Sequence, residues 1–208
     1  SRYRRRHNAR RIGRPMKVNL GSGFKRIEGF VNVDDDPLVE PDYLVNIEEA
    51  KLPFEDNSVE EIRAHHILEH IGDGFIPLMK ELHRVCKHGA LLDIVVPHHF
   101  HDNFYGDPTH KRPITVSGMY MFSKKHCEEH KEAYGSSSGM ALKYGIDFDV
   151  EWYDFEYDPF YQNMVDMMKK KTEDGTMTHD EQFMFRRLMR EANNVALHTM
   201  IKMRAVKE

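Results

Sequence analysis

The sequence predicts an α/β protein built on a doubly wound sheet of seven strands. Short apolar segments alternate with polar and helical connectors along the chain. The first apolar segment runs into a glycine turn that leads directly to a second one. A chain of 208 residues is long enough for one seven-stranded α/β core. We therefore expect a single domain over residues 16–208, preceded by a basic N-terminal arm at residues 1–15.

Apolar runs and alternating patterns place the strands along this domain. We expect strands near residues 16–20, 30–33, 43–46, 60–65, 90–96, 146–157 and 195–206. In the last segment Val195, Leu197, Ile201 and Met203 recur at odd positions, which favours a strand over a helix.

The connectors between these strands are partly helical. Residues 75–85 should form a helix because apolar residues recur there at the spacing of one helix face. Lys87-His88-Gly89 is typical of its end. Further helices are expected at 117–134, 160–171 and 180–192, and an irregular loop at 97–116. Only residues 24–29 join the glycine turn to the second strand, so a helix there has room for about one turn.

Residues 18–34 carry the most informative functional pattern. Gly21 and Gly23 allow the backbone to approach a ligand closely, and Asp34 ends the next strand, where a carboxylate can bind both hydroxyls of a ribose. A dinucleotide site needs a third glycine that opens a helix and an acid about 20 residues further on. Here position 26 is arginine and Asp34 follows too soon. The expected ligand has a ribose and a small charged tail, as S-adenosylmethionine does.

Several motifs in residues 16–125 resemble the class I S-adenosylmethionine-dependent methyltransferases. After the glycine turn come Asn-Val-Asp at 32–34, Leu-Pro-Phe at 52–54, His-Ile-Leu-Glu-His at 66–70 and Arg-Val-Cys-Lys-His-Gly at 84–89. Each motif is a weak signal, but their common order is a strong one, and it is most similar to the type 11-like group. The resemblance implies a Rossmann-like sheet with an antiparallel last strand, helices on both faces and S-adenosyl-L-methionine as cofactor.

The same resemblance implies which residues bind the cofactor. They are Asn19, Gly21, Ser22, Gly23, Asp34, Asp35, Asn46, Ile47, His65 and His66. Asn46 stands where many relatives have aspartate near the adenine amino group, and its side-chain carbonyl can accept the same hydrogen bond. His70 matches the same motif but is better explained as a structural residue that caps or bridges helices.

A histidine-rich loop follows the fifth strand, at the edge of the sheet where open α/β folds bind their ligands. Three roles are open for it. It can simply shape the pocket, or supply a general base, for which His99, His101 and His110 are the candidates because histidines titrate near neutral pH. It can also bind a divalent metal ion. Adjacent histidines in a loop are poor evidence for chelation, so we predict no metal ligands.

The predicted function is methyl transfer to a small hydroxyl- or amine-bearing acceptor, with a sugar as the leading example. The alternatives are an acceptor in nucleic acid or protein, and a module that binds S-adenosylmethionine without turnover. Asp158-Pro159-Phe160-Tyr161 resembles a motif of DNA amino-methyltransferases. It follows the sixth strand instead of the fourth, which argues against methylation of a DNA base.

Charge and composition bound the partners. The first 15 residues contain seven arginines and no acid, although the whole chain has a net charge of −4. Such an arm can bind nucleic acid, but it can equally be a solvated segment over an acidic body. Cys86 and Cys127 offer no disulfide framework, and neither a membrane span nor a signal peptide is visible. We expect a cytoplasmic protein and leave its oligomeric state open.

Overall fold

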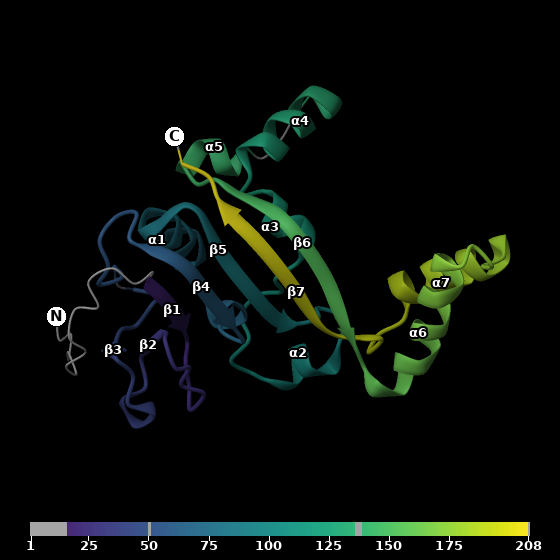
Figure 1. Cartoon of the computed structure of the whole chain (residues 1–208), viewed down its shortest axis with the longest axis horizontal. Coiled ribbons are helices and arrows are strands. Elements are labelled where there is room, and N and C mark those ends of the chain that lie inside the picture. Colours follow the sequence, from purple (N-terminus) through teal and green to yellow (C-terminus); the bar gives the residue numbers. More distant parts are fainter. Residues whose placement is uncertain (1–15, 50, 136–138, 208) are drawn as a thin grey trace.

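The structure is a computed structural model that describes residues 16–49, 51–135 and 139–207. Its single sheet has seven strands in the order β3-β2-β1-β4-β5-β7-β6, and β7 runs antiparallel to both of its neighbours (Figure 1). The strands are β1 (Met16–Leu20), β2 (Val31–Asp34), β3 (Tyr43–Leu44), β4 (Val59–His65), β5 (Cys86–Pro97), β6 (Phe148–Tyr157) and β7 (Ala196–Ala205). The predicted seven-stranded sheet and its antiparallel last strand are confirmed. The predicted basic arm lies outside the described residues.

Most of the α-helices follow β5. They are the short 3-10 helices η1 (Pro37–Val39) and η2 (Leu68–His70), and the α-helices α1 (Phe75–Val85), α2 (Asp102–Gly106), α3 (Val116–Tyr120), α4 (Lys124–Tyr134), α5 (Met140–Tyr144), α6 (Pro159–Glu173) and α7 (His179–Glu191). The expected helices at 75–85, 160–171 and 180–192 are therefore present within two residues of their predicted ends.

Four local predictions were wrong. The link at 24–29 forms turns and no helix, because Asn19 and Asn32 bind its backbone with their side chains. Lys87-His88-Gly89 belongs to β5, since α1 ends two residues earlier. The expected helix at 117–134 is divided into α3 and α4, because the side chain of Ser123 caps a new helix start. The loop at 97–116 contains the short helix α2.

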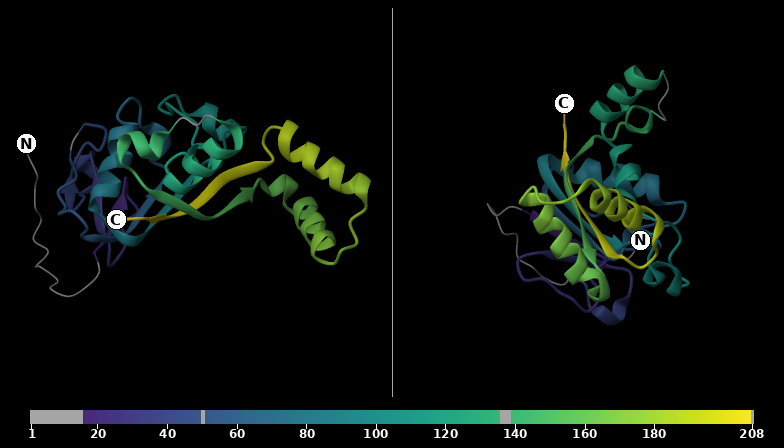
Figure 2. Two further views of the ribbon diagram at one scale, coloured as in Figure 1. Left: turned by 90° about the horizontal axis from the view of Figure 1, so that it is seen from above. Right: turned by 90° about the vertical axis from the view of Figure 1, so that its right-hand side faces the viewer.

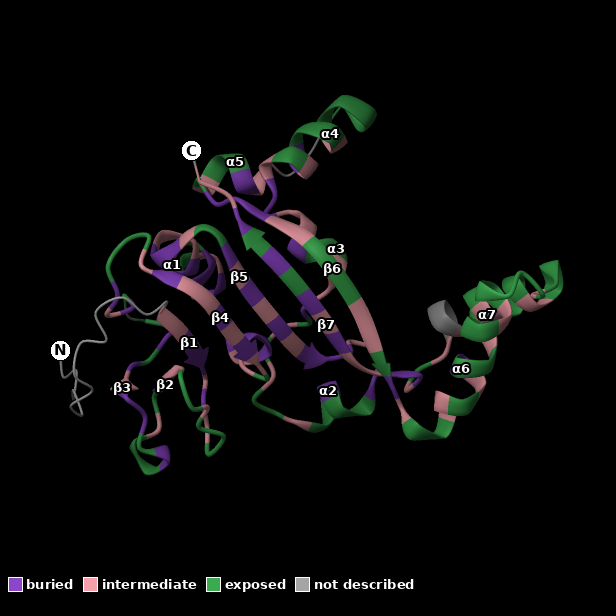
Figure 3. Ribbon diagram, viewed as in Figure 1, coloured by how far each residue is buried: buried purple, intermediate pink, exposed green. Residues whose placement is uncertain are grey.

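The two faces of the sheet differ in character. In β4, β5 and β7 alternate side chains such as Ile62, Leu92 and Ile201 are fully buried against helices that include α1. The opposite face of the same strands carries mainly polar side chains, with the apolar Leu91, Val95 and Met200 among them. In Figure 1 this face is not covered by the described helices, while α1 and α3 lie behind the sheet. Figure 3 shows the resulting alternation of buried and more exposed residues along these strands. Where the resemblance implied a second layer of helices, the described residues leave this polar face open.

The helical hairpin α6–α7 extends away from the sheet beyond the end of β6 (Figure 2). Asp158 caps α6 through its side chain, with Pro159 at the first helical position. Thr178 and Glu181 form a reciprocal capping box at the start of α7. Local capping therefore defines both helices, and a small apolar cluster around Val165 together with the ion pair of Lys169 and Asp154 connects them to the sheet.

Within the described residues, no helix is long and apolar enough to cross a membrane.

Candidate functional site

The glycine turn after β1 is shaped by two different constraints. Gly21 has φ +64°, and a Cβ on it would lie 2.5 Å from a side-chain carbon of Ile67 in the turn after β4. Gly23 also has a positive φ, of +48°, but a Cβ there would meet nothing within 4 Å. Gly21 is therefore required for packing, whereas Gly23 borders open space that a ligand can fill.

Asp34, at the tip of β2, lies beside this turn. Its Oδ2 accepts a hydrogen bond from the backbone N–H of Gly23 at 2.7 Å, and its Oδ1 accepts one from Asp36 N–H at 3.0 Å. Each carboxylate oxygen can accept a second hydrogen bond, so both remain able to bind hydroxyls. Between the two glycines, the Ser22 side chain is buried and its Oγ has no hydrogen-bond partner among the described residues. Asp35, the next predicted residue, is exposed.

Asn19 stabilises the turn through hydrogen bonds of its side-chain amide. Its Nδ2 donates to the Lys25 carbonyl at 3.0 Å and to Asn32 Oδ1 at 2.9 Å. Asn32 in turn donates to the carboxylate of Asp42, which also forms an ion pair with Arg26. Burial alone would raise the pKa of Asp42, but these hydrogen bonds and the Arg26 charge lower it below its ordinary value. The structure thus gives Asn19 a supporting position, since its amide binds the loop backbone.

The predicted residues at the tips of β3 and β4 differ in their exposure and in their hydrogen-bond partners. Asn46 is exposed, and its Oδ1 accepts a hydrogen bond from Glu48 N–H, while Ile47 is buried. His65 points to the open face of the sheet, where its Nε2 lies 2.9 Å from Asp93 Oδ2. His66 has an unusual φ of +54° and reaches the edge of the strands, with Nδ1 3.7 Å from Glu69 Oε1. Strained backbone of this kind is common at functional sites.

Two histidines directly after β5 are partly or fully buried. Burial and the neighbouring His99 and His101 lower the pKa of His98 to about 4, and burial lowers the pKa of His99 as well. The expectation that the loop histidines have ordinary pKa values is therefore wrong for these two. His99 Nδ1 is buried and has no partner among the described residues. It borders a pocket of about 230 Å³, lined by His99, Thr115, Val116, Ser117, Phe155 and Thr199.

The other two candidate bases lie apart from this pocket. His101 Nδ1 accepts a hydrogen bond from Asn103 N–H at 3.0 Å and so caps α2, and its Nε2 faces Asp158 Oδ2 at 3.4 Å. Both nitrogens of His101 therefore connect parts of the chain. His110 lies against Glu69 and His70, with its Nε2 4.0 Å from Glu69 Oε1. The sequence alone does not bring Glu69, His70 and His110 together, because 40 positions separate His110 from His70.

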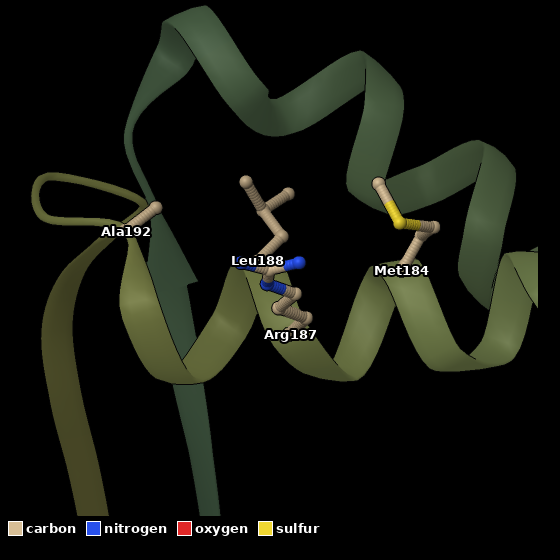
Figure 4. A pocket seen from close by; sticks show the side chains of 4 residues that line it. All are labelled: Met184, Arg187, Leu188 and Ala192. Atoms are coloured by element: carbon tan, nitrogen blue, oxygen red, sulfur yellow. The ribbon is translucent and has the colours of Figure 1, made fainter.

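A second pocket, of about 260 Å³, is lined by Met184, Arg187, Leu188 and Ala192 of the α7 region. Figure 4 shows Met184 and Leu188 projecting from α7 on the side that faces α6. This pocket lies on the helical hairpin, which follows the carboxyl end of β6, and contains none of the predicted site residues. We therefore do not assign it to the candidate site.

Comparisons with known proteins support the fold. No family model matches the sequence, and a search of curated proteins finds no match. Solved structures do match, among them an S-adenosylmethionine-dependent methyltransferase from Archaeoglobus fulgidus (TM-score 0.54, 13% identity, 92% of this chain and 86% of that one). Others are the YcgJ protein from Bacillus subtilis (0.51, 14%, 93% and 93%) and the [4+2]-cyclase SpnF (0.52, 12%, 93% and 76%).

At such low identity these similarities establish the fold and no more. The seven-stranded sheet, with its strand order and antiparallel β7, is that of the class I S-adenosylmethionine-dependent methyltransferases. The similarity to a [4+2]-cyclase is a reminder that one fold carries more than one reaction. The function must therefore be argued from the side chains at the strand ends.

Proposed function

We propose that this chain binds S-adenosyl-L-methionine and transfers its methyl group to a small acceptor that bears a hydroxyl or an amine. The observation that carries the proposal is the glycine turn at the carboxyl edge of the sheet. There Gly23 borders open space, and Asp34 presents a carboxylate from the neighbouring strand. Ligands of open α/β sheets bind at this edge.

The residues present fit such a cofactor. Asp34 would accept hydrogen bonds from the ribose hydroxyls, since each of its oxygens retains a free acceptor position. The buried Oγ of Ser22 lacks a partner in the described part of the chain, and a polar group of the cofactor would satisfy it. Asn46, exposed beyond β3, is the predicted contact for the adenine. When bound, the cofactor supplies a methyl group that is already activated as a sulfonium.

His99 is the residue that we propose as general base. Its lowered pKa keeps the imidazole neutral at pH 7, and the partnerless Nδ1 can accept a proton from an acceptor hydroxyl or ammonium group. Thr199 lines the same pocket and has a buried Oγ that also lacks a partner among the described residues. A pocket of about 230 Å³ that is lined by these two residues, each with a buried polar atom lacking a partner among the described residues, favours a small polar acceptor over a macromolecule.

Binding of S-adenosylhomocysteine, the demethylated product, tests the first half of this proposal. Calorimetry should show one site per chain and no comparable binding of NAD. At 100 times its dissociation constant the ligand should stabilise the fold by about 2.7 kcal/mol. Asp34→Ala should weaken the affinity by about 1.5–3 kcal/mol, because a charged acceptor of two hydrogen bonds is lost.

Asp35→Ala is the matched control, since Asp35 is an exposed carboxylate one position further along. It was itself a predicted cofactor contact, so the pair of variants also decides between the two acids. A folded protein that shows no thermal shift with millimolar ligand would contradict the proposal.

A further inference from the structure

Glu69 is a carboxylate in an unusual position. It lies in η2, directly after β4, and its side chain is completely buried. Neither of its carboxylate oxygens has a hydrogen-bond partner among the described residues. Burying a carboxylate without a partner is costly, so such a group requires compensation from a cation or a proton.

Two cationic residues contact the backbone of Glu69, but their side chains are bound elsewhere. Lys111 and Arg112 fix the loop over Glu69, because their backbone N–H groups donate to its carbonyl oxygen at 2.8 and 3.2 Å. Their side chains turn away, however. Lys111 pairs with Glu48 at 2.7 Å, and the Arg112 guanidinium donates to the carbonyls of Ile71 and Gly72. The backbone of Glu69 is thus held in place, while its carboxylate is not neutralised by either of them.

Three histidines, His66, His70 and His110, lie around this carboxylate. The hydrogen bonds of the last two leave one acceptor nitrogen on each ring. His110 Nδ1 lies 2.7 Å from the Phe104 carbonyl, to which it must donate its proton, so Nε2 keeps its lone pair. Thr109 Oγ1 donates to Asp107 Oδ1 at 2.6 Å and therefore accepts from His70 Nδ1–H at 2.9 Å. His70 Nε2 is then an acceptor too. Hydrogen bonds of this type fix the tautomer of metal-binding histidines.

We propose that Glu69, His70 and His110 bind a divalent metal ion. Each offers one ligand atom, and these atoms all lie within 4.8 Å of one another. Ligand atoms around a bound ion are about 3–3.5 Å apart, given bonds of about 2.1 Å, so small side-chain rotations would complete the site. Asp107 Oδ2, 3.8 Å from His110 Nε2, is available as a fourth ligand. This site replaces the sequence-based prediction of no metal ligands.

The donor set indicates the kind of ion. Two imidazole nitrogens and one carboxylate favour first-row transition ions such as Mn²⁺, Co²⁺ or Zn²⁺ over Mg²⁺ or Ca²⁺, which prefer oxygen ligands only. A set of three protein ligands leaves coordination positions open for any of these ions, and a set of four does so for an ion that takes six ligands, such as Mn²⁺. The ion would therefore bind additional oxygen atoms from outside the chain.

The position of the site suggests what it binds, and this step rests on the function proposed above. Glu69 and His70 follow β4 directly, and His66 connects them to the strand tips beside the glycine turn. An oxygen atom of the acceptor would bind the ion and be oriented there, while the proton of the reacting hydroxyl would pass to His99 as proposed above. The preferred acceptor would be a compound with a hydroxyl and a second oxygen ligand, such as neighbouring hydroxyls.

Metal binding can be measured without knowing the acceptor. The full chain is freed of metal with a chelator, transferred to chelator-free buffer and titrated with Mn²⁺, followed by electron paramagnetic resonance, or with Co²⁺, followed by visible absorption. We expect one equivalent per chain. Glu69→Gln and His110→Ala should each weaken binding at least tenfold, and Thr109→Val, which frees His70 Nδ1, should weaken it about 10–100-fold.

Matched controls separate this site from non-specific binding. His179→Ala and Glu173→Gln remove the same chemical groups from exposed positions on the helical hairpin and should bind the ion like the unmodified chain. In the metal-free state Glu69→Gln should melt at the same or a higher temperature, because a buried charge is removed. The ion should raise the melting temperature of the unmodified chain but not that of Glu69→Gln.

Two results would overturn the site: substoichiometric binding to the unmodified chain, or equal affinity of the three site variants and the two controls. Calorimetry with S-adenosylhomocysteine on the same samples keeps the two proposals separate. A chain that binds the ion but not this ligand retains the metal site and loses the methyltransferase function. The opposite result retains the function and removes the metal.

Discussion

The edge of the sheet has two halves that treat their buried polar groups differently. In the glycine half, from β1 to β3, Asn19 and Asn32 are connected in a hydrogen-bonded network, Asp34 accepts two backbone N–H groups, and one buried atom, Ser22 Oγ, lacks a partner among the described residues. In the histidine half, from β4 to the loop after β5, buried atoms of Glu69 and His99 that can carry or accept a proton lack partners among the described residues. The backbone of the glycine half is therefore largely preformed, whereas the histidine half has titratable groups that a substrate or an ion would satisfy.

The largest expected effect tests the histidine half. His99→Ala should lower turnover by about 10²–10⁴-fold, the usual loss for a general base, and leave the affinity for S-adenosylhomocysteine unchanged. The rate would be measured as release of this product, with an acceptor found by screening small hydroxyl and amine compounds. His101→Ala, which removes the cap of α2, should instead cost about 1 kcal/mol of stability. Equal rates for the unmodified chain and His99→Ala would show that His99 is not a general base and that the loop only shapes the pocket.

Three glycine variants test the glycine half. Gly21→Ala should cost about 2–5 kcal/mol of unfolding free energy, because it combines a positive φ with a clash against Ile67. Gly23→Ala and Gly29→Ala have a positive φ but no clash and should cost about 1–2 kcal/mol each. Only Gly23→Ala should also lose cofactor affinity, because Gly29 precedes β2 and lies away from its tip. Chemical denaturation and calorimetry separate these outcomes.

The glycine half was largely predictable from the sequence because its function depends on local order. A strand, two glycines and an acid on the next strand are contiguous in the chain, so Gly23 and Asp34 could be paired before their contact was seen. The strand positions could be predicted for the same reason, because each strand's pattern is also contiguous in the chain. The absence of a helix at 24–29 could not be predicted, because it depends on hydrogen bonds between the side chains of Asn19 and Asn32 and the backbone of this segment.

The histidine half was less predictable because its contacts are between distant segments. The sequence places His70 in one motif and His110 in another, and the two segments are brought together by contacts that the sequence does not show, such as the backbone bonds from Lys111 and Arg112 to Glu69. Burial also changed the chemistry. Nothing in the run His98-His99 shows that packing against Phe100 and Phe155 lowers the pKa of His98 to about 4.

This burial predicts a pH dependence of stability in the histidine half. His98 binds a proton near pH 6.5 when unfolded but only near pH 4 when folded, so the unfolded state gains more protons on acidification. The stabilisation is complete above pH 6.5 and should fall by about 1–3 kcal/mol as the pH drops to 4. His98→Gln should flatten this slope in denaturation curves, while the exposed His179→Gln should not. Parallel slopes for all three proteins would show that His98 titrates normally.

The smallest effect is expected from removal of residues 1–14, which belong to neither half. The polar side chains of the open face are already paired, since His65 contacts Asp93 at 2.9 Å and Arg204 contacts Glu151 at 2.8 Å, and the apolar Leu91, Val95 and Met200 among them are partly buried without the arm. The deletion should therefore change the unfolding free energy by less than about 0.5 kcal/mol, or about 1–2 °C in melting temperature. Cofactor affinity should also persist, while salt-dependent retention on heparin should be lost. A much larger drop in melting temperature would show that the arm packs onto the fold. The stability of the sheet edge would then depend on the arm as well as on its two halves.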